Sequence, residues 1–255
     1  MELTVLGCAG GIGGRERETT CLWLDDDILL DAGTGLSQLN IQQLVGIDHI
    51  FLTHSHLDHV AGLALLLDAV AGKKRYPVTV HATEKVTALL KQHLFNWILW
   101  PDFSTIPTSD NPILRWEPIE PGQEITLHGR SIAAHAVNHT HGSVAYSVRK
   151  TTTGFLFSGD MCATPALWEA VTHEKGIHQI IVDCSFPNAE ADLAAKSMHF
   201  CPASLVQDVS AISEPMNFLI YHLKPGQEDA IMQELMQAES IHTFIALQNF
   251  DKFNF

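Results

Sequence analysis

Short apolar runs separated by polar turns occupy the first half of the chain, and most of them are too short for helices. Residues 1–7 read as a first strand, and two further runs, Cys21 to Leu24 and Ile28 to Leu30, flank an acidic turn in the manner of a β-hairpin. The predicted elements that follow are a helix over 36–45, a strand over 48–53, a helix over 60–71, a strand over 77–81, a helix over 83–95, and strands over 113–119, 123–128, 130–137 and 143–149.

The second half has a different pattern, because apolar runs of strand length alternate with longer segments of helical periodicity. The expected order is strand 154–159, helix 164–175, strand 177–184, helix 188–196, helix 202–213, strand 217–222, helix 228–239 and strand 241–246. A strand-rich half followed by an alternating half predicts an α+β fold in which two sheets pack face to face and helices cover the outside.

The composition predicts one folded domain over residues 1–255. The chain is 46% hydrophobic and only 17% charged, and it has no linker, internal repeat or low-complexity tract. It contains no run of about 18 apolar residues, its first residues read as a strand rather than a signal peptide, and its five cysteines are scattered. We therefore expect a cytoplasmic protein with reduced thiols that does not act on membranes.

The charge balance narrows the choice of substrates. The formal net charge is −14, and the longest basic block is only Lys73-Lys74-Arg75. Such a surface repels the phosphate backbone, so long nucleic acids are poor candidates for a partner. Small anions stay compatible with the sequence, because bound metal ions add positive charge that the formal count omits.

The segment Thr53-His54-Ser55-His56-Leu57-Asp58-His59 places three imidazoles and a carboxylate within residues 54–59. It lies between a predicted strand and a predicted helix, where a loop can aim all four side chains at one point or divide them between two ions. Packing does not require four metal-type ligands at a strand end, so a metal site explains the segment better than a polar surface turn does.

Three later segments each place a histidine or an aspartate at the end of a predicted strand. Asn138-His139-Thr140-His141 follows the strand over 130–137, Asp160 follows Gly159 at the end of the strand over 154–159, and His222 ends the strand over 217–222. An isolated histidine at a strand end is more often an ordinary core or surface group. Three such ends, in a chain that already carries the 54–59 segment, indicate further ligands for the same site.

These motifs resemble the metallo-β-lactamase superfamily, in which H-x-H-x-D-H is followed by His, Asp and His in this order. The resemblance covers nearly the whole chain and extends to the class II cyclic-nucleotide phosphodiesterases. Its matching strings are Leu6 to Gly11, Leu30 to Gly35, His54 to Leu67, Trp100 to Phe103, Phe157 to Asp160, Ser185 to Asn188 and Tyr221 to Pro225. The chain departs from the class II pattern at Asp68, where the family has serine, and over 197–202, where Ser-Gly-His-Leu-Thr-Pro is expected.

The resemblance implies the metallo-β-lactamase fold, a four-layer αββα sandwich of two mixed sheets flanked by helices, with the site at one sheet edge. It also implies that His54, His56 and His139 bind a first ion, that Asp58, His59 and His222 bind a second ion, and that Asp160 bridges them. His141 is the alternative to His139 as third ligand of the first ion. A ligand set of imidazoles and carboxylates suits two divalent ions, with Zn²⁺ the first expectation and Mn²⁺ or Fe²⁺ the alternatives. Related enzymes are often dimers, and the sequence leaves a homodimer open.

Two ions about 3.5–4 Å apart can share a hydroxide, lower the pKa of its parent water toward 7 and offset the charge of a phosphate. We therefore predict hydrolysis of a small phosphodiester, 3′,5′-cyclic AMP or GMP, to the 5′-monophosphate by metal-bound hydroxide. The candidate catalytic residues are Asp58, His199 and His141. His199 is the first candidate for the acid that protonates the leaving 3′ oxygen and His141 the second, since neither is needed as a ligand and histidine transfers protons near neutral pH.

Three residues have competing interpretations. Asn96 and Trp97 are candidates for bounding or stacking on a purine, although aromatic residues at such spacing more often belong to the core. Asp31 is expected either to orient a ligand imidazole through a hydrogen bond or to cap the turn at Gly33-Thr34-Gly35.

Other functions are compatible with the same motifs. One is a related metallohydrolase acting on another small phosphodiester, a lactone, a thioester or a sulfate ester. A tRNA 3′-end nuclease is less favoured because of the net charge. A non-catalytic metal-binding module is also less favoured, because every expected ligand position is filled.

Overall fold

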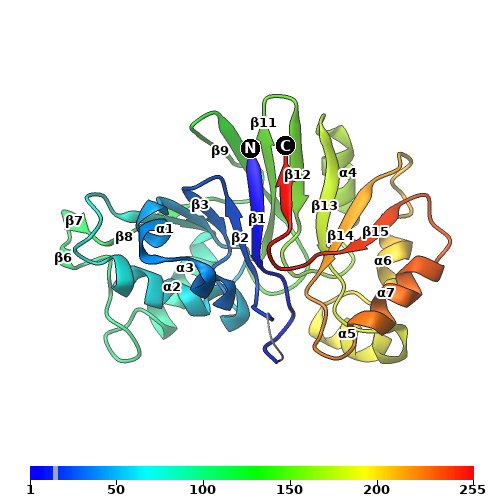
Figure 1. Cartoon of the computed structure of the whole chain (residues 1–255), viewed down its shortest axis with the longest axis horizontal. Coiled ribbons are helices and arrows are strands. Elements are labelled where there is room, and N and C mark those ends of the chain that lie inside the picture. Colours follow the sequence, from blue (N-terminus) through cyan, green and yellow to red (C-terminus); the bar gives the residue numbers. More distant parts are fainter. Residues whose placement is uncertain (14–16) are drawn as a thin grey trace.

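Two seven-stranded sheets lie face to face at the centre of the molecule, in a computed structural model that describes residues 1–13 and 17–255 (Figure 1). The first sheet has the order β16-β1-β2-β3-β4-β5-β8. Its strands are β1 (Glu2–Gly7), β2 (Cys21–Leu24), β3 (Ile28–Leu30), β4 (His49–Phe51), β5 (Val78–Ala82), β8 (Leu114–Pro118) and β16 (Lys252–Asn254).

The second sheet has the order β15-β14-β13-β12-β11-β10-β9. Its strands are β9 (Glu124–Leu127), β10 (Arg130–Ala136), β11 (Val144–Lys150), β12 (Thr153–Phe157), β13 (Ile177–Asp183), β14 (Asn217–Tyr221) and β15 (Thr243–Ala246). Both sheets are mixed: β1, β2 and β3 pair antiparallel while β3, β4, β5 and β8 pair parallel, and β9 to β12 pair antiparallel while β12 to β15 pair parallel.

Helices cover the two outer faces, as Figure 1 shows. The helices on the first sheet are α1 (Ile41–Gly46), α2 (Leu57–Val70) and α3 (Glu84–His93), and those on the second are α4 (Pro165–His173), α6 (Pro202–Val209) and α7 (Glu228–Gln237), with α5 (Ala191–Ser197) at the lower edge. The predicted four-layer αββα sandwich is thereby confirmed. None of the described helices has both the length and the apolar character that crossing a membrane requires.

The alternation of side chains along the strands builds three buried apolar layers, one between the two sheets and one between each sheet and its helices. In β1, Leu3 and Val5 pack between the sheets, whereas Leu6 faces the helices of the first half. Because successive strand residues point to opposite faces, a strand buried on both sides reads as a continuous apolar run. The Tyr146 hydroxyl donates to the Leu52 carbonyl (2.9 Å), so the two sheets are also joined by a buried hydrogen bond just before the 54–59 segment.

The predicted helix over 36–45 is wrong in one respect, because the structure divides it. A 3₁₀ helix, η1, spans Thr34–Gln38, and α1 begins only at Ile41. Asn40 lies between them, and its side chain accepts hydrogen bonds from the backbone N–H groups of Gln42 and Gln43. Asparagine satisfies these free N–H groups better at a helix start than inside a helix, so the second helix starts there.

The sequence pattern did not indicate the last strand. Residues Lys252–Asn254 form β16, which pairs antiparallel with β1 and adds an edge to the first sheet. The terminal amino group of Met1 donates to the Phe255 carbonyl (2.9 Å), and the two ends lie side by side in Figure 1. This pairing joins the two ends of the sequence in one sheet, so local periodicity cannot reveal it.

Candidate metal centre

The 54–59 segment joins a strand of the first sheet to its longest helix. Strand β4 ends at Phe51 and α2 begins at Leu57, so His54 and His56 lie on the connection while Asp58 and His59 lie in the first turn of the helix. A carboxylate in the first turn is favoured by the partial positive charge of the helix N-terminus. The connection between strand and helix therefore points all four side chains toward one edge of the sandwich.

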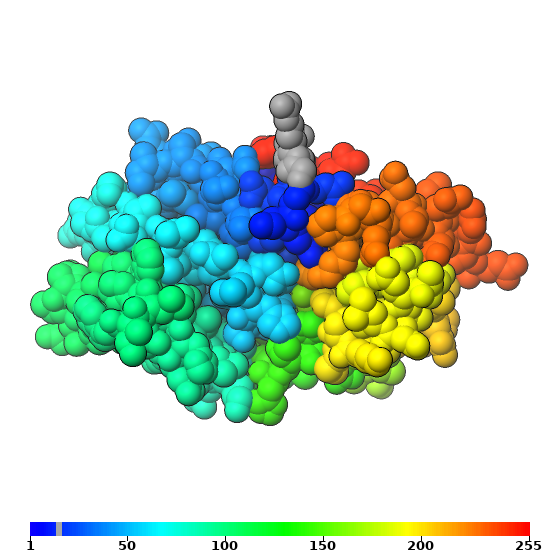
Figure 2. Space-filling view, turned by 90° about the horizontal axis from the view of Figure 1, so that it is seen from below, coloured from blue at the N-terminus to red at the C-terminus, as the bar shows by residue number. Residues whose placement is uncertain are grey.

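The second sheet delivers three more candidates at the same edge. His139 follows β10, Asp160 follows β12 and His222 follows β14. Figure 2 views this edge, where segments from the blue, cyan, green, yellow and orange parts of the sequence meet. The predicted ligands are thus brought together from both halves of the chain.

Two glycines allow this close approach. Gly159, directly before Asp160, has φ +60°, and a Cβ there would lie 2.8 Å from Cβ of Thr53. A Cβ on Gly10 would lie 2.2 Å from the carbonyl oxygen of His222. Any larger residue at either position would displace a segment that carries a candidate ligand.

The side chains form two groups that share one carboxylate. The first group is His54, His56, His139 and Asp160, and the second is Asp58, His59, Asp160 and His222; within each group the ligand atoms lie within 4.8 Å of one another. Oδ2 of Asp160 is 3.7 Å from Nε2 of His54 and 3.2 Å from Nε2 of His222. One oxygen atom therefore faces both groups.

The geometry and the unpaired atoms fit metal ions. Ligand atoms about 2.1 Å from a shared tetrahedral ion lie roughly 3.4 Å apart, which matches 3.2 Å between His56 Nδ1 and His139 Nε2 and 3.1 Å between His222 Nε2 and Asp58 Oδ2. Within the described part of the chain, Nε2 of His54, Nε2 of His59 and Oδ2 of Asp160 are buried with no hydrogen-bond partner. Buried polar atoms are rarely left unsatisfied, so these three atoms indicate a site that binds a cation.

Three of the imidazoles are electrostatically suited to bind a cation. Loss of solvation inside the site lowers the pKa of His54, His56 and His139, and neighbouring imidazoles add to the effect at His54 and His56. Burial disfavours the charged form, so these rings are neutral near pH 7. A neutral imidazole is the form that binds a metal ion.

The carboxylates act in the opposite direction. Burial alone would lower the pKa of His59, but the negative charges of Asp160 and Asp31 raise it well above its usual value; a cation bound to Asp160 would offset the first of these charges and favour the neutral ring that binds metal. Burial would raise the pKa of Asp58, yet the neighbouring imidazoles of His222 and His59 hold it well below its usual range. Asp58 is therefore ionised throughout the neutral range, as a metal-binding carboxylate must be.

Asp31 lies behind the first half of the site and is completely buried. Its Oδ2 accepts from Nδ1 of His59 (2.7 Å) and from the hydroxyl of Thr53 (2.8 Å), and Oγ1 of Thr53 lies 3.0 Å from Nδ1 of His54. Because the single hydroxyl hydrogen goes to Asp31, His54 donates its Nδ1–H to Thr53. The sequence analysis gave two interpretations of Asp31, a residue that orients a ligand imidazole or a cap of the turn over 33–35. The contact with His59 favours the first interpretation, which stays a prediction.

A second buried carboxylate, Asp183, lies behind the other half of the site and was missed by the sequence analysis. Its Oδ2 accepts from Nδ1 of His199 (2.7 Å). Burial alone would lower the pKa of His199, but the charge and hydrogen bond of Asp183 raise it overall. The ring of His199 lies 4.9 Å from that of His139 and stacks 5.1 Å from that of His222. Asp183 is the last residue of β13, and Asp160 comes shortly after β12. The strand-end pattern that identified Asp160 in the sequence could therefore have identified Asp183 as well.

His141 is exposed and, within the described residues, belongs to neither metal group. It lines a pocket of about 560 Å³ beside His139, with Lys85, Asn138 and Met198 on the walls. This volume lies in the range of small-molecule binding pockets.

Asn96 and Trp97 are not among the described residues that line the pocket beside His139. The Asn96 side chain accepts from the backbone N–H groups of Ile98 and Leu99, and Trp97 is 62% exposed with φ +64°. Their role in base binding stays a prediction.

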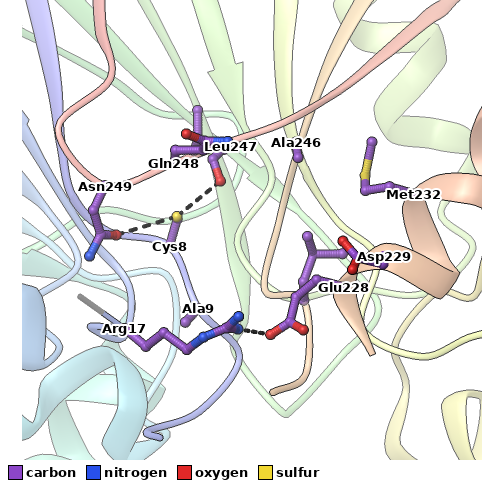
Figure 3. A pocket seen from close by; sticks show the side chains of 11 residues that line it. Cys8, Ala9, Arg17, Glu228, Asp229, Met232, Ala246, Leu247, Gln248 and Asn249 are labelled. Carbon is purple, nitrogen blue, oxygen red and sulfur yellow. Dashed lines mark hydrogen bonds and ion pairs between the residues drawn. The ribbon is translucent and has the colours of Figure 1, made fainter. Parts of the chain in front are cut away.

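A different pocket, of about 370 Å³, lies between the segment after β1 and the C-terminal strands (Figure 3). Arg17 pairs with Glu228 across it, and the Cys8 thiol donates to the Leu247 carbonyl (3.3 Å). Burial raises the pKa of Cys8 to about 12, so this thiol is not a nucleophile near neutral pH. The contacts of this pocket connect the two halves of the chain.

Two proteins are similar in sequence to more than half of this chain. The 3′,5′-cyclic-nucleotide phosphodiesterase of Schizosaccharomyces pombe is 28% identical over 233 residues, which cover 76% of this chain and 64% of that protein. Ribonuclease Z of Staphylococcus haemolyticus is 29% identical over 170 residues, covering 60% of this chain and 51% of that protein. The chain thus spans about half to two thirds of the length of these relatives.

The fold has a counterpart among solved structures. The crystal structure of unliganded yeast PDE1 superimposes with a TM-score of 0.78 at 19% identity, covering 97% of each chain. The family model described as the beta-lactamase superfamily domain matches residues 26–223, which include every candidate ligand. With these motifs, this fold and this match, the chain belongs to the β-lactamase superfamily.

Proposed function

We propose that this protein is a metal-dependent phosphodiesterase that hydrolyses 3′,5′-cyclic nucleotides to 5′-monophosphates. The observation that carries the proposal is the position of Asp160 Oδ2, which lies between two groups of imidazole and carboxylate ligands. The similarity to a phosphodiesterase over 76% of the chain supports the substrate class.

The chain offers ligands for two divalent ions, with Zn²⁺ the first candidate for a set of imidazoles and carboxylates. His54, His56 and His139 would hold one ion, Asp58, His59 and His222 the other, and Asp160 both. Two ions bound there supply a water-derived nucleophile at neutral pH and positive charge for the non-bridging phosphate oxygens.

The remaining requirement is a proton for the leaving group. In the reaction a P–O bond forms to the water oxygen, the bond from phosphorus to the 3′ oxygen breaks, and that oxygen takes up a proton. We assign this transfer to His199, and two observations support the assignment: Asp183 accepts its Nδ1–H, and its ring lies beside those of His139 and His222. Nε2 is thereby left for the substrate, and the carboxylate stabilises the protonated ring.

The pocket of about 560 Å³ beside His139 supplies room for the nucleoside. Lys85 provides a cation on its wall, and Asn138 and His141 provide hydrogen-bonding groups. If Trp97 nevertheless stacks on the base, Trp97→Ala will raise KM for cyclic AMP more than KM for bis-p-nitrophenyl phosphate; equal changes would exclude stacking.

A tRNA-processing nuclease is the second candidate, favoured by the similarity to ribonuclease Z. The formal net charge of −14 works against it, because a polyanionic substrate gains affinity from basic surfaces.

The test is the product formed when the metal-loaded protein is incubated with 3′,5′-cyclic AMP, with His56→Ala as the control. His56 is exposed, so its truncation leaves the core intact. Appearance of 5′-AMP with the wild type alone is the expected result. If cyclic AMP persists while bis-p-nitrophenyl phosphate is cleaved, the two-ion site is right and the nucleotide substrate is wrong.

A further inference from the structure

Ser185 lies at the centre of a buried hydrogen-bond cluster behind the second metal group. It follows β13, is completely buried, and has three polar partners. Its Oγ lies 2.6 Å from Oδ1 of Asp183, 2.8 Å from Nδ1 of His222 and 3.2 Å from Nδ1 of His199. One hydroxyl therefore contacts a candidate ligand and the candidate proton donor.

A count of protons fixes the direction of these hydrogen bonds. The Asp183 carboxylate only accepts, so it takes the Ser185 hydroxyl hydrogen at Oδ1 and the Nδ1–H of His199 at Oδ2. With its only hydrogen used, Ser185 accepts toward His222, whose Nδ1 must then carry the proton. The lone pair of His222 Nε2 is left facing Asp58 Oδ2 (3.1 Å) and Asp160 Oδ2 (3.2 Å).

We propose that Ser185 is a positioning residue that fixes the ring orientation and tautomer of His222, so that Nε2 binds the second ion, and that it connects this ligand to His199 through Asp183. The inference rests on the two-ion site of the proposed function. A ligand imidazole typically donates its other N–H to an oxygen that fixes its tautomer, and here a serine hydroxyl backed by a carboxylate takes that place.

A metal ion within the cluster of Asp183, His199 and His222 would be another interpretation of these side chains. The distances argue against it. Asp183 lies only 2.7 Å from Nδ1 of His199 and 2.6 Å from the Ser185 hydroxyl, which are hydrogen-bond lengths. Ligands of a shared ion would be roughly 3.4 Å apart.

The experiment compares Zn²⁺ binding by the metal-free wild-type chain of residues 1–255 with binding by Ser185→Ala, Ser185→Thr and Ser147→Ala. Each is titrated in competition with a chromophoric chelator, and bound zinc is counted after dialysis. Ser147→Ala is the matched control, because it also removes a completely buried serine hydroxyl that contacts a histidine (His135 Nε2, 2.9 Å). Ser185→Thr retains the hydroxyl.

We expect Ser185→Ala to bind one of two ions about 10–100-fold more weakly and the other unchanged. Ser185→Thr should recover the wild-type pattern, and Ser147→Ala should keep it. Equal binding of both ions by Ser185→Ala and the wild type would overturn the inference and leave the proposed function intact. So would a folded Ser185→Thr that loses the second ion, a result that decides the question even if Ser185→Ala does not fold. A wild type that binds fewer than two ions would instead contradict the two-ion site.

Discussion

Each half of the molecule supports the metal centre with a buried carboxylate and an adjacent hydroxyl, and the two supports differ in what they hold. In the first half, Asp31 contacts His59 directly and His54 through Thr53. In the second half, Asp183 contacts His199 directly and His222 through Ser185. The chemistry of the two units is the same, although they lie in different sheets.

The difference lies in the imidazole that each carboxylate contacts directly. His59 belongs to a metal group that includes Asp160, whereas His199 belongs to neither of the two groups built around Asp160 among the described residues. Asp31 therefore supports two candidate ligands, and Asp183 supports one candidate ligand and one imidazole that stays available to a substrate. In our proposal, the same hydrogen-bond unit serves metal binding in one half and proton transfer in the other.

The largest expected effect is that of Asp160→Ala, because Asp160 joins the two halves. Its Oδ2 faces both metal groups, so its removal should reduce bound metal from about two ions per chain toward none. Metal analysis after dialysis measures this, with the exposed Asp110→Ala as the control. Full occupancy of both sites in Asp160→Ala would contradict the bridging role.

His199→Asn tests whether the second unit differs from the first. We expect the rate of hydrolysis to fall by about 10²–10⁴-fold with both ions retained, since a general acid contributes about that factor. Steady-state kinetics and metal analysis on the same preparation provide both values, and His141→Asn is the matched variant for the rival acid. Loss of an ion in His199→Asn would show that His199 is itself a metal ligand. Both carboxylates would then support only ligands, and the proposed difference between the two units would be wrong.

Asp31→Asn should have a smaller effect that still distinguishes the units. Because Asp31 supports ligands of both groups, the affinity for both ions should fall by about 10–100-fold, whereas Asp183→Asn should weaken only one. Competition titration with zinc measures the two constants. If both variants weaken a single ion, the assignment of His54 and His59 to different ions is wrong.

The smallest effect concerns His81, a buried imidazole whose polar partner is another imidazole, Nδ1 of His49 (3.0 Å), instead of a carboxylate. Burial lowers its pKa from 6.5 to about 3, with His49 adding to the effect. The unfolded chain then binds more protons than the folded chain between these pH values, so the free energy of unfolding falls as pH falls from about 6.5 toward 3.

His81→Leu should remove this contribution, which is at most about 1.4 kcal/mol per pH unit. Urea unfolding of the metal-free proteins between pH 4 and 7 provides the slopes. An unchanged slope in the variant would show that a buried imidazole without a carboxylate titrates normally here. The contrast with His59 and His199, whose carboxylates raise the pKa, would then lose its basis.

Much of the site could be predicted because its residues either adjoin one another or end strands. The 54–59 segment is local, so its ligands are visible in a single line of sequence. His222 follows an apolar run, and so does Asp160 after its glycine, which marks both as strand ends. Thr53 and Ser185 could not be found this way, because serine and threonine are common at such positions and their role depends on partners; Ser185 meets His222 across 37 residues.

The sequence by itself determined the alternation of strands and helices, the two-layer sheet core and most of the candidate ligands, because each depends on periodicity or on a motif within a short window. Only the tertiary structure decided that β16 closes the first sheet, that His139 and not His141 joins the first group, and that Asp31 and Asp183 support equivalent hydrogen-bond units. These are contacts between segments far apart in the chain, and their energy depends on distance and direction in space, which residue type alone does not fix.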